Sequence, residues 1–233
     1  MFSRSARLYD AIYASLRDYP HQAAELDRLI QERRPGARTL LDVACGTGAH
    51  LEHLSGRYEV EGLDLDPEML AVARERLPQA RFHEADMADF DLGRRFDAVV
   101  CMFSSIGYVR TEARLRAAVA AMARHLEPGG VLIVEPWLAP DAWREGHVGG
   151  VFVDEPELKI ARVNVAERQG DLSTVDFHYL VATPAGVEHF TELHELGLFT
   201  LDQHLEAFRA AGLAVEHDPE GPWGRGLYLA TAA

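Results

Sequence analysis

The stretch Leu41-Asp42-Val43-Ala44-Cys45-Gly46-Thr47-Gly48 decides the fold of this 233-residue chain. The apolar run 39–44 is typical of a buried strand, the two glycines turn the chain, and residues 50–54 begin a helix. In doubly wound sheets a ligand binds beyond the carboxyl ends of the strands at such a turn. Glycine lets the ligand approach the backbone closely. We therefore expect a cofactor beside Ala44, Gly46 and Gly48.

The spacing of these glycines argues against two common nucleotide-binding motifs. A nicotinamide fingerprint, Gly-x-Gly-x-x-Gly, would place its third glycine where Leu51 stands. A Walker loop would require Gly-Lys-Ser or Gly-Lys-Thr, and the sequence has neither. Asp42 adds a carboxylate beside the turn. This charge disfavours a pyrophosphate and favours a cofactor that carries an ammonium and a sulfonium.

Two further acidic residues follow in an order that fits such a cofactor. Asp64 ends the next predicted strand, roughly 20 residues past the glycine turn, the spacing at which a carboxylate binds a ribose diol. Asp86 follows a third short strand, where its carboxylate can accept a hydrogen bond from an adenine amino group while Met87 packs on the ring. The ordered set of Asp42, Asp64 and Asp86 is more specific than the glycines alone.

Strands and helices alternate along most of the chain. The predicted strands are 39–44, 58–63, 81–83, 96–102, 131–135, 213–217 and 226–231, and the predicted helices are 22–33, 50–54, 67–77, 112–125 and 201–211. This alternation predicts βαβ units and a mostly parallel sheet with helices on both faces, an α/β fold.

Residues 150–199 break the alternation. Three strand-like stretches are predicted there, 160–168, 173–182 and 187–199, with Gly170-Asp171 as a hairpin turn between the first two. We therefore expect an antiparallel β meander inserted into the α/β domain.

Composition narrows the class of protein further. The formal charge is -14, which disfavours nucleic-acid binding and an anionic membrane surface, because both require clustered Lys and Arg. Cys45 and Cys101 each lie in an apolar run, which predicts two buried thiols rather than a disulfide, and no metal-ligand spacing is present. No run of residues predicts a signal peptide or a membrane span. We expect a cytoplasmic protein.

Beyond these features, the sequence resembles a known family across nearly its whole length. The segments that carry the resemblance are Leu-Leu-Asp-Val-Ala-Cys-Gly-Thr-Gly at 40–48, 85–90, 92–96, Met-Phe-Ser-Ser-Ile-Gly at 102–107, His-Leu-Glu-Pro-Gly-Gly at 125–130, Val-Glu-Pro-Trp at 134–137, 178–179, 198–199 and Gly-Arg-Gly-Leu at 224–227. The chain resembles class I S-adenosylmethionine-dependent methyltransferases. Within them it is most similar to the TDP-3-amino-3,6-dideoxyhexose N,N-dimethyltransferases of macrolide amino-sugar biosynthesis.

The resemblance implies S-adenosylmethionine as cofactor and a small-molecule acceptor, for which a TDP-sugar is the candidate. It also implies a doubly wound, Rossmann-like sheet of seven strands with the antiparallel β meander inserted. On this basis residues 1–149 form the cofactor-binding core with an N-terminal lid, 150–199 the insertion on the substrate side, and 200–233 the completion of the core. The cofactor contacts implied, beside those argued above, are Leu65, Met69, Met102, Phe103 and Ser104, with Tyr9, Tyr13 and Tyr19 closing over the methionine end.

Candidate acceptor-side residues follow the fourth and fifth strands or lie in the meander. Tyr108 would orient an acceptor by a hydrogen bond, and Glu135 would hold an amine or hydroxyl beside Trp137. On the last meander strand His194 shares a face with Phe190, which predicts a partly buried histidine. The remaining candidates are His178 as a catalytic residue, Tyr179 and Trp223 as substrate contacts, and Arg225, between two glycines, for a phosphate.

Three functions remain open on these grounds. The leading hypothesis is N-methylation of a nucleotide-linked amino sugar. The second keeps the cofactor but methylates an aromatic N, O or C nucleophile, such as an indole or a phenol, in a pocket formed by Trp137, Trp223 and Tyr108. The third is a nicotinamide-dependent oxidoreductase, against which Leu51 speaks. Exposed strand edges in the meander, together with the resemblance, further predict a homodimer.

Overall fold

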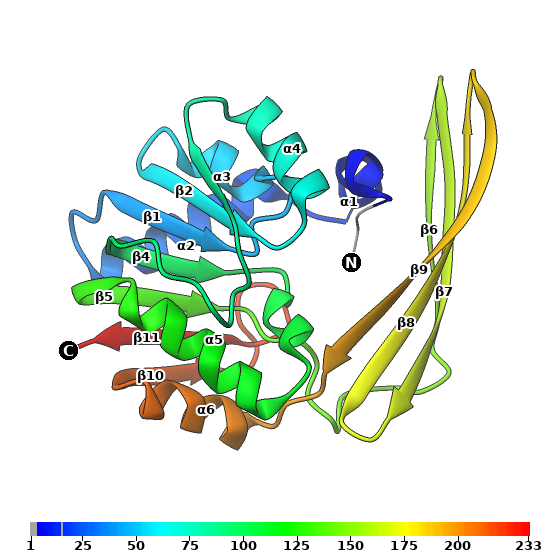
Figure 1. Cartoon of the computed structure of the whole chain (residues 1–233). Helices are drawn as coiled ribbons and strands as arrows, with labels where there is room; N and C mark the ends of the chain where they lie inside the picture. Colours follow the sequence, from blue (N-terminus) through cyan, green and yellow to red (C-terminus); the bar gives the residue numbers. More distant parts are fainter. Residues whose placement is uncertain (1–3, 15) are drawn as a thin grey trace.

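Two sheets organise the protein, and they lie beside each other with the N-terminal helices between them (Figure 1). The computed structural model describes residues 4–14 and 16–233. The strands of the seven-stranded sheet are β1 (Thr39–Val43), β2 (Glu59–Asp64), β3 (Arg81–Glu84), β4 (Phe96–Cys101), β5 (Leu126–Val134), β10 (Leu213–Asp218) and β11 (Leu227–Ala232), in the order β10-β11-β5-β4-β1-β2-β3. This confirms the predicted doubly wound α/β fold.

The directions of the strands indicate the edge of this sheet at which a ligand would bind. Strands β1 to β5 pair in parallel, whereas β11 is antiparallel to both of its neighbours. Because β2 and β4 lie on opposite sides of β1, the chain reverses its winding at β1, and the crevice beyond the carboxyl ends of β1 and β4 is where ligands bind in such sheets.

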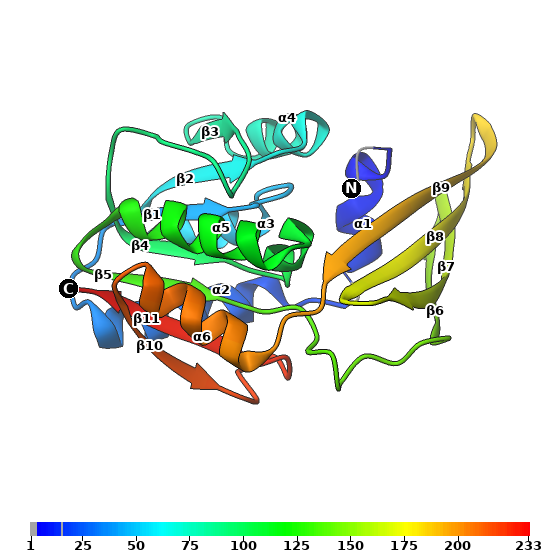
Figure 2. The same cartoon turned by 60° about the horizontal axis from the view of Figure 1, so that its bottom comes forward.

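The helices cover both faces of the seven-stranded sheet, as the alternation of strand and helix predicts. Strand β4 shows the two layers, because Val99 and Cys101 pack with one cluster while Ala98 and Val100 pack with the other. Helices α5 (Glu112–Arg124) and α6 (Leu201–Ala210) cover the first face and lie in front of the sheet in Figure 2. The second face is covered by α2 (Tyr19–Arg33), α3 (Ala49–Leu54) and α4 (Pro67–Arg76). No helix in the described ranges is both long and apolar enough for a membrane crossing.

The second sheet is the expected antiparallel meander, but it has four strands instead of three. They are β6 (Val148–Glu155), β7 (Leu158–Gln169), β8 (Leu172–Thr183) and β9 (Gly186–Gly197), in that order. The sequence analysis missed β6, because its two glycines weaken the strand pattern and its side chains are half-exposed or exposed. The Gly170-Asp171 turn joins β7 to β8 as predicted.

The fifth strand of the core also differs from the prediction. It begins at Leu126, not at Val131, because Leu126 pairs with Phe96 and the register then shifts before Val131 pairs with Ala98. The Pro-Gly-Gly sequence therefore forms an irregularity within the strand rather than the stop before it. Gly129, with a φ of 70°, supplies the left-handed residue in this irregularity.

The N-terminal segment joins the two sheets. The 3-10 helix η1 (Ala6–Leu8) and helix α1 (Tyr9–Tyr13) lie between α4 and the four-stranded sheet (Figure 1). Ile12 and Tyr13 of α1 share one apolar cluster with Tyr179 and Phe190 of the four-stranded sheet and with Met69 of α4. The cavity between the sheets is therefore closed on this side by residues from the start of the chain.

Candidate active site

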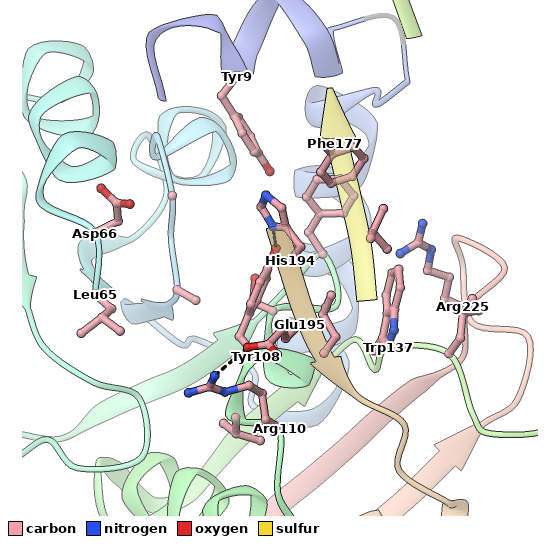
Figure 3. Close-up of a pocket in the computed structure, with 18 of the residues that line it drawn as sticks. Tyr9, Leu65, Asp66, Tyr108, Arg110, Trp137, Phe177, His194, Glu195 and Arg225 are labelled. Atoms are coloured by element: carbon pink, nitrogen blue, oxygen red, sulfur yellow. Dashed lines mark hydrogen bonds and ion pairs between the residues drawn. The ribbon is translucent and has the colours of Figure 1, made fainter. Parts of the chain in front are cut away.

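A large cavity lies between the carboxyl ends of the parallel strands and the inner face of the four-stranded sheet. Its volume is about 1140 Å³. The cofactor-side residues that line it are Tyr9, Tyr13, Ala44, Gly46, Asp64, Leu65, Met69, Asp86, Met87 and Phe103, and the acceptor-side residues include Tyr108, Trp137, His194, Trp223 and Arg225. Figure 3 shows Leu65 on one side of this space, with Trp137 and Arg225 opposite.

Asp64 ends β2 and is held in place by the glycine turn. Its Oδ2 accepts a hydrogen bond from the backbone N–H of Gly46 at 2.8 Å, and its Oδ1 accepts one from the N–H of Asp66 at 2.9 Å. Burial raises the pKa of Asp64, while these backbone hydrogen bonds act in the opposite direction. Each carboxylate oxygen keeps a second lone pair, so the group can accept hydrogen bonds from a vicinal diol.

Asp42, at the end of β1, is almost completely buried at 1% exposure. Within the described part of the chain, its Oδ1 has no hydrogen-bond partner. Burial, and then the charge of Asp64, raise the pKa of Asp42 to about 8. The carboxyl group borders a small cavity of about 30 Å³, which is also lined by Tyr19, His50 and Met102. A buried carboxyl whose Oδ1 has no partner among the described residues, beside a small cavity, fits the ammonium group of an amino acid.

Asp86 lines the far end of the large cavity. Its carboxylate forms an ion pair with Arg114 of α5 at 2.6 Å, and its Oδ1 accepts a hydrogen bond from the N–H of Ala88. Although burial opposes the change, the hydrogen bond from Arg114 lowers the pKa of Asp86. Met87 lies beside it, partly buried against the core. The structure thus gives Asp86 a cationic partner that the sequence analysis did not foresee.

The loop after β4 carries unusual backbone geometry. Phe103 and Ser104 have φ values of 56° and 61°, in the left-handed region that residues other than glycine seldom adopt. Glu135 at the end of β5 accepts a hydrogen bond from the N–H of Phe103 at 2.7 Å, and Ser104 donates one to the carbonyl of Pro136 at 2.7 Å. Burial raises the pKa of Glu135. Glu135 is thus placed behind the loop, where it holds the strained backbone in position.

The three N-terminal tyrosines are divided between the two cavities. Tyr9 and Tyr13 of α1 line the large cavity, whereas Tyr19 lines only the small one beside Asp42. Asp10 anchors α1, because it accepts a hydrogen bond from the Thr47 hydroxyl of the glycine turn at 2.8 Å and pairs with Arg76 of α4 at 2.5 Å. The lid and the glycine turn are therefore directly connected.

These residues fit S-adenosylmethionine. The unpartnered Asp42 oxygen suits the ammonium of its methionine part, and Asp64 suits its ribose diol. Gly46, with a φ of 55°, has no atom of the described residues within 4 Å of the position that a Cβ atom would take, so its backbone is open to a ligand. Once bound, the cofactor supplies an activated methyl group on a sulfonium.

The acceptor side is built around one arginine. The guanidinium of Arg225 donates to the Ser104 hydroxyl at 3.0 Å and lies 5.3 Å from the ring centroid of Trp137. Burial lowers the pKa of Arg225, but an arginine stays charged. In Figure 3 Arg225 and Trp137 lie side by side at the edge of the cavity, as the ring distance requires. Trp223, two residues before Arg225, lines the same cavity.

Tyr108 and His194 form a pair across the two sheets. Tyr108 belongs to the 3-10 helix η2 (Ser105–Val109) after β4, and His194 belongs to β9. The Tyr108 hydroxyl lies 2.6 Å from His194 Nδ1, and both residues line the cavity (Figure 3). Burial raises the pKa of Tyr108 and lowers the pKa of His194. The imidazole of this pair is therefore neutral at neutral pH, and its Nδ1 shares a hydrogen bond with the Tyr108 hydroxyl.

Among the candidates that lie outside the large cavity are two residues of the four-stranded sheet. His178 is exposed on the outer face of β8, 3.3 Å from Asp176, as its alternation with apolar residues predicts, and it does not line the cavity. Tyr179 points inward but is fully buried, stacked on Phe190 with ring centroids 4.6 Å apart. It supports the cavity wall without lining it.

The structure also adds residues that the sequence analysis missed. Arg162 of β7 is buried, donates to the Tyr13 hydroxyl at 2.9 Å and lines the cavity with Phe177 of β8. Its signal was present in the sequence, since Arg162 occupies an inward position two residues after the buried Ile160. Without the strand pairing, however, the direction of this face could not be assigned.

Comparison with known proteins gives the same class of protein as the fold and site. A methyltransferase domain family matches residues 40–130. The chain is 47% identical over 226 residues to the dTDP-3-amino-3,6-dideoxy-alpha-D-glucopyranose N,N-dimethyltransferase of Streptomyces fradiae, covering 96% of this chain and 89% of that one. Together with these matches, the glycine turn, the acidic residues at the strand ends and the doubly wound sheet define an S-adenosylmethionine-dependent methyltransferase.

Solved structures narrow the class to one family. The crystal structure of Streptomyces venezuelae DesVI has a TM-score of 0.93 and 46% identity, covering 98% of each chain. The S-adenosylmethionine-bound amino pentose methyltransferase CalS10 of Micromonospora echinaspora has a TM-score of 0.89 and 44% identity, covering 97% of each chain. The chain belongs to the family of the dTDP-amino-sugar N,N-dimethyltransferases. This family assignment confirms S-adenosylmethionine as the cofactor and leaves no support for the nicotinamide hypothesis.

Proposed function

We propose that this protein transfers the methyl group of S-adenosylmethionine to the amino group of a nucleotide-linked amino sugar. The observation that carries the proposal is that Asp64 and Asp86 line one continuous cavity with the Arg225–Trp137 pair. Relatives that are 42–47% identical over 96–98% of this chain carry names that specify dTDP-amino sugars as their acceptors.

The acceptor side fits the two halves of such a substrate. Arg225 can bind a phosphate with two parallel N–H groups, which favours arginine wherever a planar, bidentate contact is required. Trp137, Trp223 and Phe177 offer apolar surface for the deoxygenated part of a sugar. Because the guanidinium already rests on Trp137 and Ser104, little rotational freedom is lost when a phosphate binds.

The chemistry requires a neutral amine. An ammonium must lose a proton before its lone pair attacks the methyl carbon, and the carbon–sulfur bond then breaks as the carbon–nitrogen bond forms. We assign acceptance of this proton to the Tyr108–His194 pair, because it joins a hydroxyl on the cavity wall to a neutral imidazole. Glu135 is assigned to positioning the Phe103–Ser104 backbone, and alignment of donor and acceptor supplies the remaining catalysis.

Methyl transfer from isotopically labelled S-adenosylmethionine tests the proposal. The purified protein is incubated with a panel of TDP-3-amino and TDP-4-amino sugars, and in parallel with indoles, phenols and aromatic amines. We expect label on the sugar nitrogen, located by NMR of the product. Turnover of the aromatic compounds alone would establish the aromatic alternative and overturn the amino-sugar assignment.

Assembly and location form a second, separate proposal. We propose a homodimer formed by the outer face of the four-stranded sheet, where Phe152 and Leu180 are 71% and 52% exposed in one cross-strand row. Light scattering at micromolar concentration should give twice the mass of the chain, and Phe152→Glu should give a monomer. A monomeric wild-type protein would refute the dimer. The two free, buried cysteines agree with the reducing cytoplasm that we propose as its location.

A further inference from the structure

Glu192 is a buried carboxylate next to the cavity that the proposed chemistry does not yet use. It lies on β9 two residues before His194, and both side chains point to the inner face of the four-stranded sheet. Its Oε2 lies 4.0 Å from His194 Nε2, on the opposite side of the ring from the nitrogen that faces Tyr108. Glu192 is only 7% exposed, and among the residues that the structure describes it does not line the cavity.

The same carboxylate is held by the N-terminal segment. Oε1 accepts hydrogen bonds from the backbone N–H groups of Arg4 and Ser5 at 3.0 and 3.1 Å, and Oε2 accepts one from the Ser5 hydroxyl at 2.7 Å. Three donors stabilise the ionised form, so the hydrogen bonds and the nearby His194 lower the pKa of Glu192 although burial opposes the change. Glu192 is therefore a fixed negative charge beside the imidazole.

We propose, on the basis of the function proposed above, that Glu192 is a positioning residue for the Tyr108–His194 pair. Its carboxylate selects the tautomer of His194 that carries its proton on Nε2, so that Nδ1 is left to accept the Tyr108 proton. It also stabilises the imidazolium that forms when the proton arrives. Tyr108, His194 and Glu192 thus act in line, in the way that a buried acid orients and supports the histidine of a hydrolase triad.

The proton balance is complete without a further reactant. The acceptor ammonium gives a proton to the Tyr108 oxygen while the Tyr108 hydroxyl proton moves to His194 Nδ1. The amine then takes the methyl group, and the sulfonium becomes a neutral thioether. His194, now an imidazolium between Tyr108 and Glu192, returns to its neutral form by releasing the proton to water.

Positive charge near the imidazole of His194 opposes its protonation, so the negative charge of Glu192 is needed to stabilise the imidazolium. Arg162 of β7 lies on the same inner face, and its positive charge, like burial, lowers the pKa of His194. Other groups that face this space include the phenols of Tyr9 and Tyr13 from α1, Tyr108 from η2 and Tyr179 from β8. Glu192 is the group whose negative charge offsets Arg162 at His194.

Titration of His194 by NMR in the complex with S-adenosylhomocysteine tests this role without depending on turnover. In Glu192→Gln, which keeps an acceptor for Ser5 but removes the charge, the pKa of His194 should fall by about one unit. Glu192→Asp keeps the charge but withdraws it by one methylene, and should give a smaller fall in the same direction. If Glu192→Gln does not fold, Glu192→Asp still tests the proposal. An unchanged pKa and tautomer of His194 in both variants would overturn the proposal.

Two control variants distinguish the effect of the Glu192 charge on His194 from the effect of holding the N-terminal segment in place. Asp10→Asn loosens the same N-terminal segment at its other anchor, Thr47 and Arg76, and should weaken S-adenosylhomocysteine binding without moving the pKa of His194. Glu188→Gln removes a carboxylate from the exposed end of the same strand face and should change neither quantity. A fall in the His194 pKa in Asp10→Asn equal to that in Glu192→Gln would assign the effect to the lid and refute the positioning role.

Kinetics with the acceptor then connect the charge to the reaction. In Glu192→Gln we expect kcat at pH 7 to fall about tenfold, within the range for losing part of a general base, while KM for the amino sugar changes little. An unchanged kcat would refute the role in catalysis. If the wild-type protein methylates no amino sugar, the proposed function fails, whereas the His194 titration still decides the role of Glu192.

Discussion

The two sheets of this protein meet the cavity in different ways. The seven-stranded sheet presents strand ends, so each strand contributes a residue or two and a turn of backbone: Asp42 and Ala44 at the end of β1, Asp64 at the end of β2. The four-stranded sheet presents a face, so alternate side chains along a strand enter the site together. The cofactor is therefore bound by short sequence motifs, and the acceptor wall by the register of long antiparallel strands.

The sharpest test of this comparison uses two histidines on opposite faces of the four-stranded sheet. We expect His194→Ala to lower kcat about 100-fold, because it removes the proton acceptor behind Tyr108, with little change in S-adenosylhomocysteine affinity. His178→Ala, on the exposed face, should keep wild-type kcat. Steady-state kinetics of both variants decide the point, and equal losses in the two would show that the faces are not functionally distinct.

A second prediction concerns the contribution of a histidine packed on the seven-stranded sheet to the stability of the protein. His204 of α6 is buried against Tyr228 with ring centroids 4.6 Å apart, and burial lowers its pKa to about 3. Its stabilising contribution is complete above the ordinary pKa of histidine and is lost as the pH falls from there through about 3. By pH 5 the loss should be about 2 kcal/mol. Denaturant unfolding of His204→Phe should show a flatter pH dependence in this window, and an unchanged slope would refute it.

The strand ends make a prediction about cofactor binding. Since the pKa of Asp42 is about 8 in the unliganded protein, binding of an ammonium group must expel a proton at neutral pH. Affinity for S-adenosylhomocysteine should rise by up to about tenfold between pH 6 and 7. Calorimetry in buffers of different ionisation enthalpy measures the released proton. Asp42→Asn should bind weakly and without this pH dependence, and a variant that retains the dependence would assign it to another group.

Burial of Asp42 also makes the stability of the protein depend on pH, in the direction opposite to that of ligand affinity. Because the folded pKa lies above the ordinary value, its contribution to stability is complete at low pH and is lost as the pH rises through about 8. Unliganded Asp42→Asn should therefore be more stable than wild type at pH 8, and equally stable or less stable protein would contradict this placement of the carboxyl.

The smallest expected effect concerns an exposed ion pair that joins the segment after η2 to the four-stranded sheet. Arg110, just after η2, pairs with Glu195 of β9 at 3.0 Å, and both side chains are at least 40% exposed. A double-mutant cycle with Arg110→Ala and Glu195→Ala should give a coupling of at most about 1 kcal/mol in the free energy of unfolding. A larger value would mean that this ion pair, and not the packed N-terminal segment, holds the sheets together.

The same difference explains how much of the protein could be predicted from sequence. The glycine turn, Asp64 and the alternating strands and helices are local patterns, so the doubly wound fold and the cofactor-side residues that line the cavity were predictable. The acceptor wall was predictable only in part: alternation placed His194 on the buried face of its strand, but Arg162 acquires a direction only through the pairing of β7 with β8. Alternation with apolar residues already separated the exposed His178 from the buried His194, but it did not predict that His194 pairs with Tyr108. The glycine-containing β6 gave too weak a pattern to be found.

The most direct test of the central claim is to titrate two ligands, S-adenosylhomocysteine and TDP, into two variants, Asp64→Ala and Arg225→Ala. Asp64→Ala should lose at least tenfold in affinity for S-adenosylhomocysteine, about 1.4 kcal/mol, and bind TDP as wild type does. Arg225→Ala should show the reverse. This crossed result would establish a cofactor on the strand ends and a nucleotide on the acceptor side of one cavity. Wild-type protein that binds S-adenosylhomocysteine but not TDP, or variants that lose both ligands equally, would contradict it.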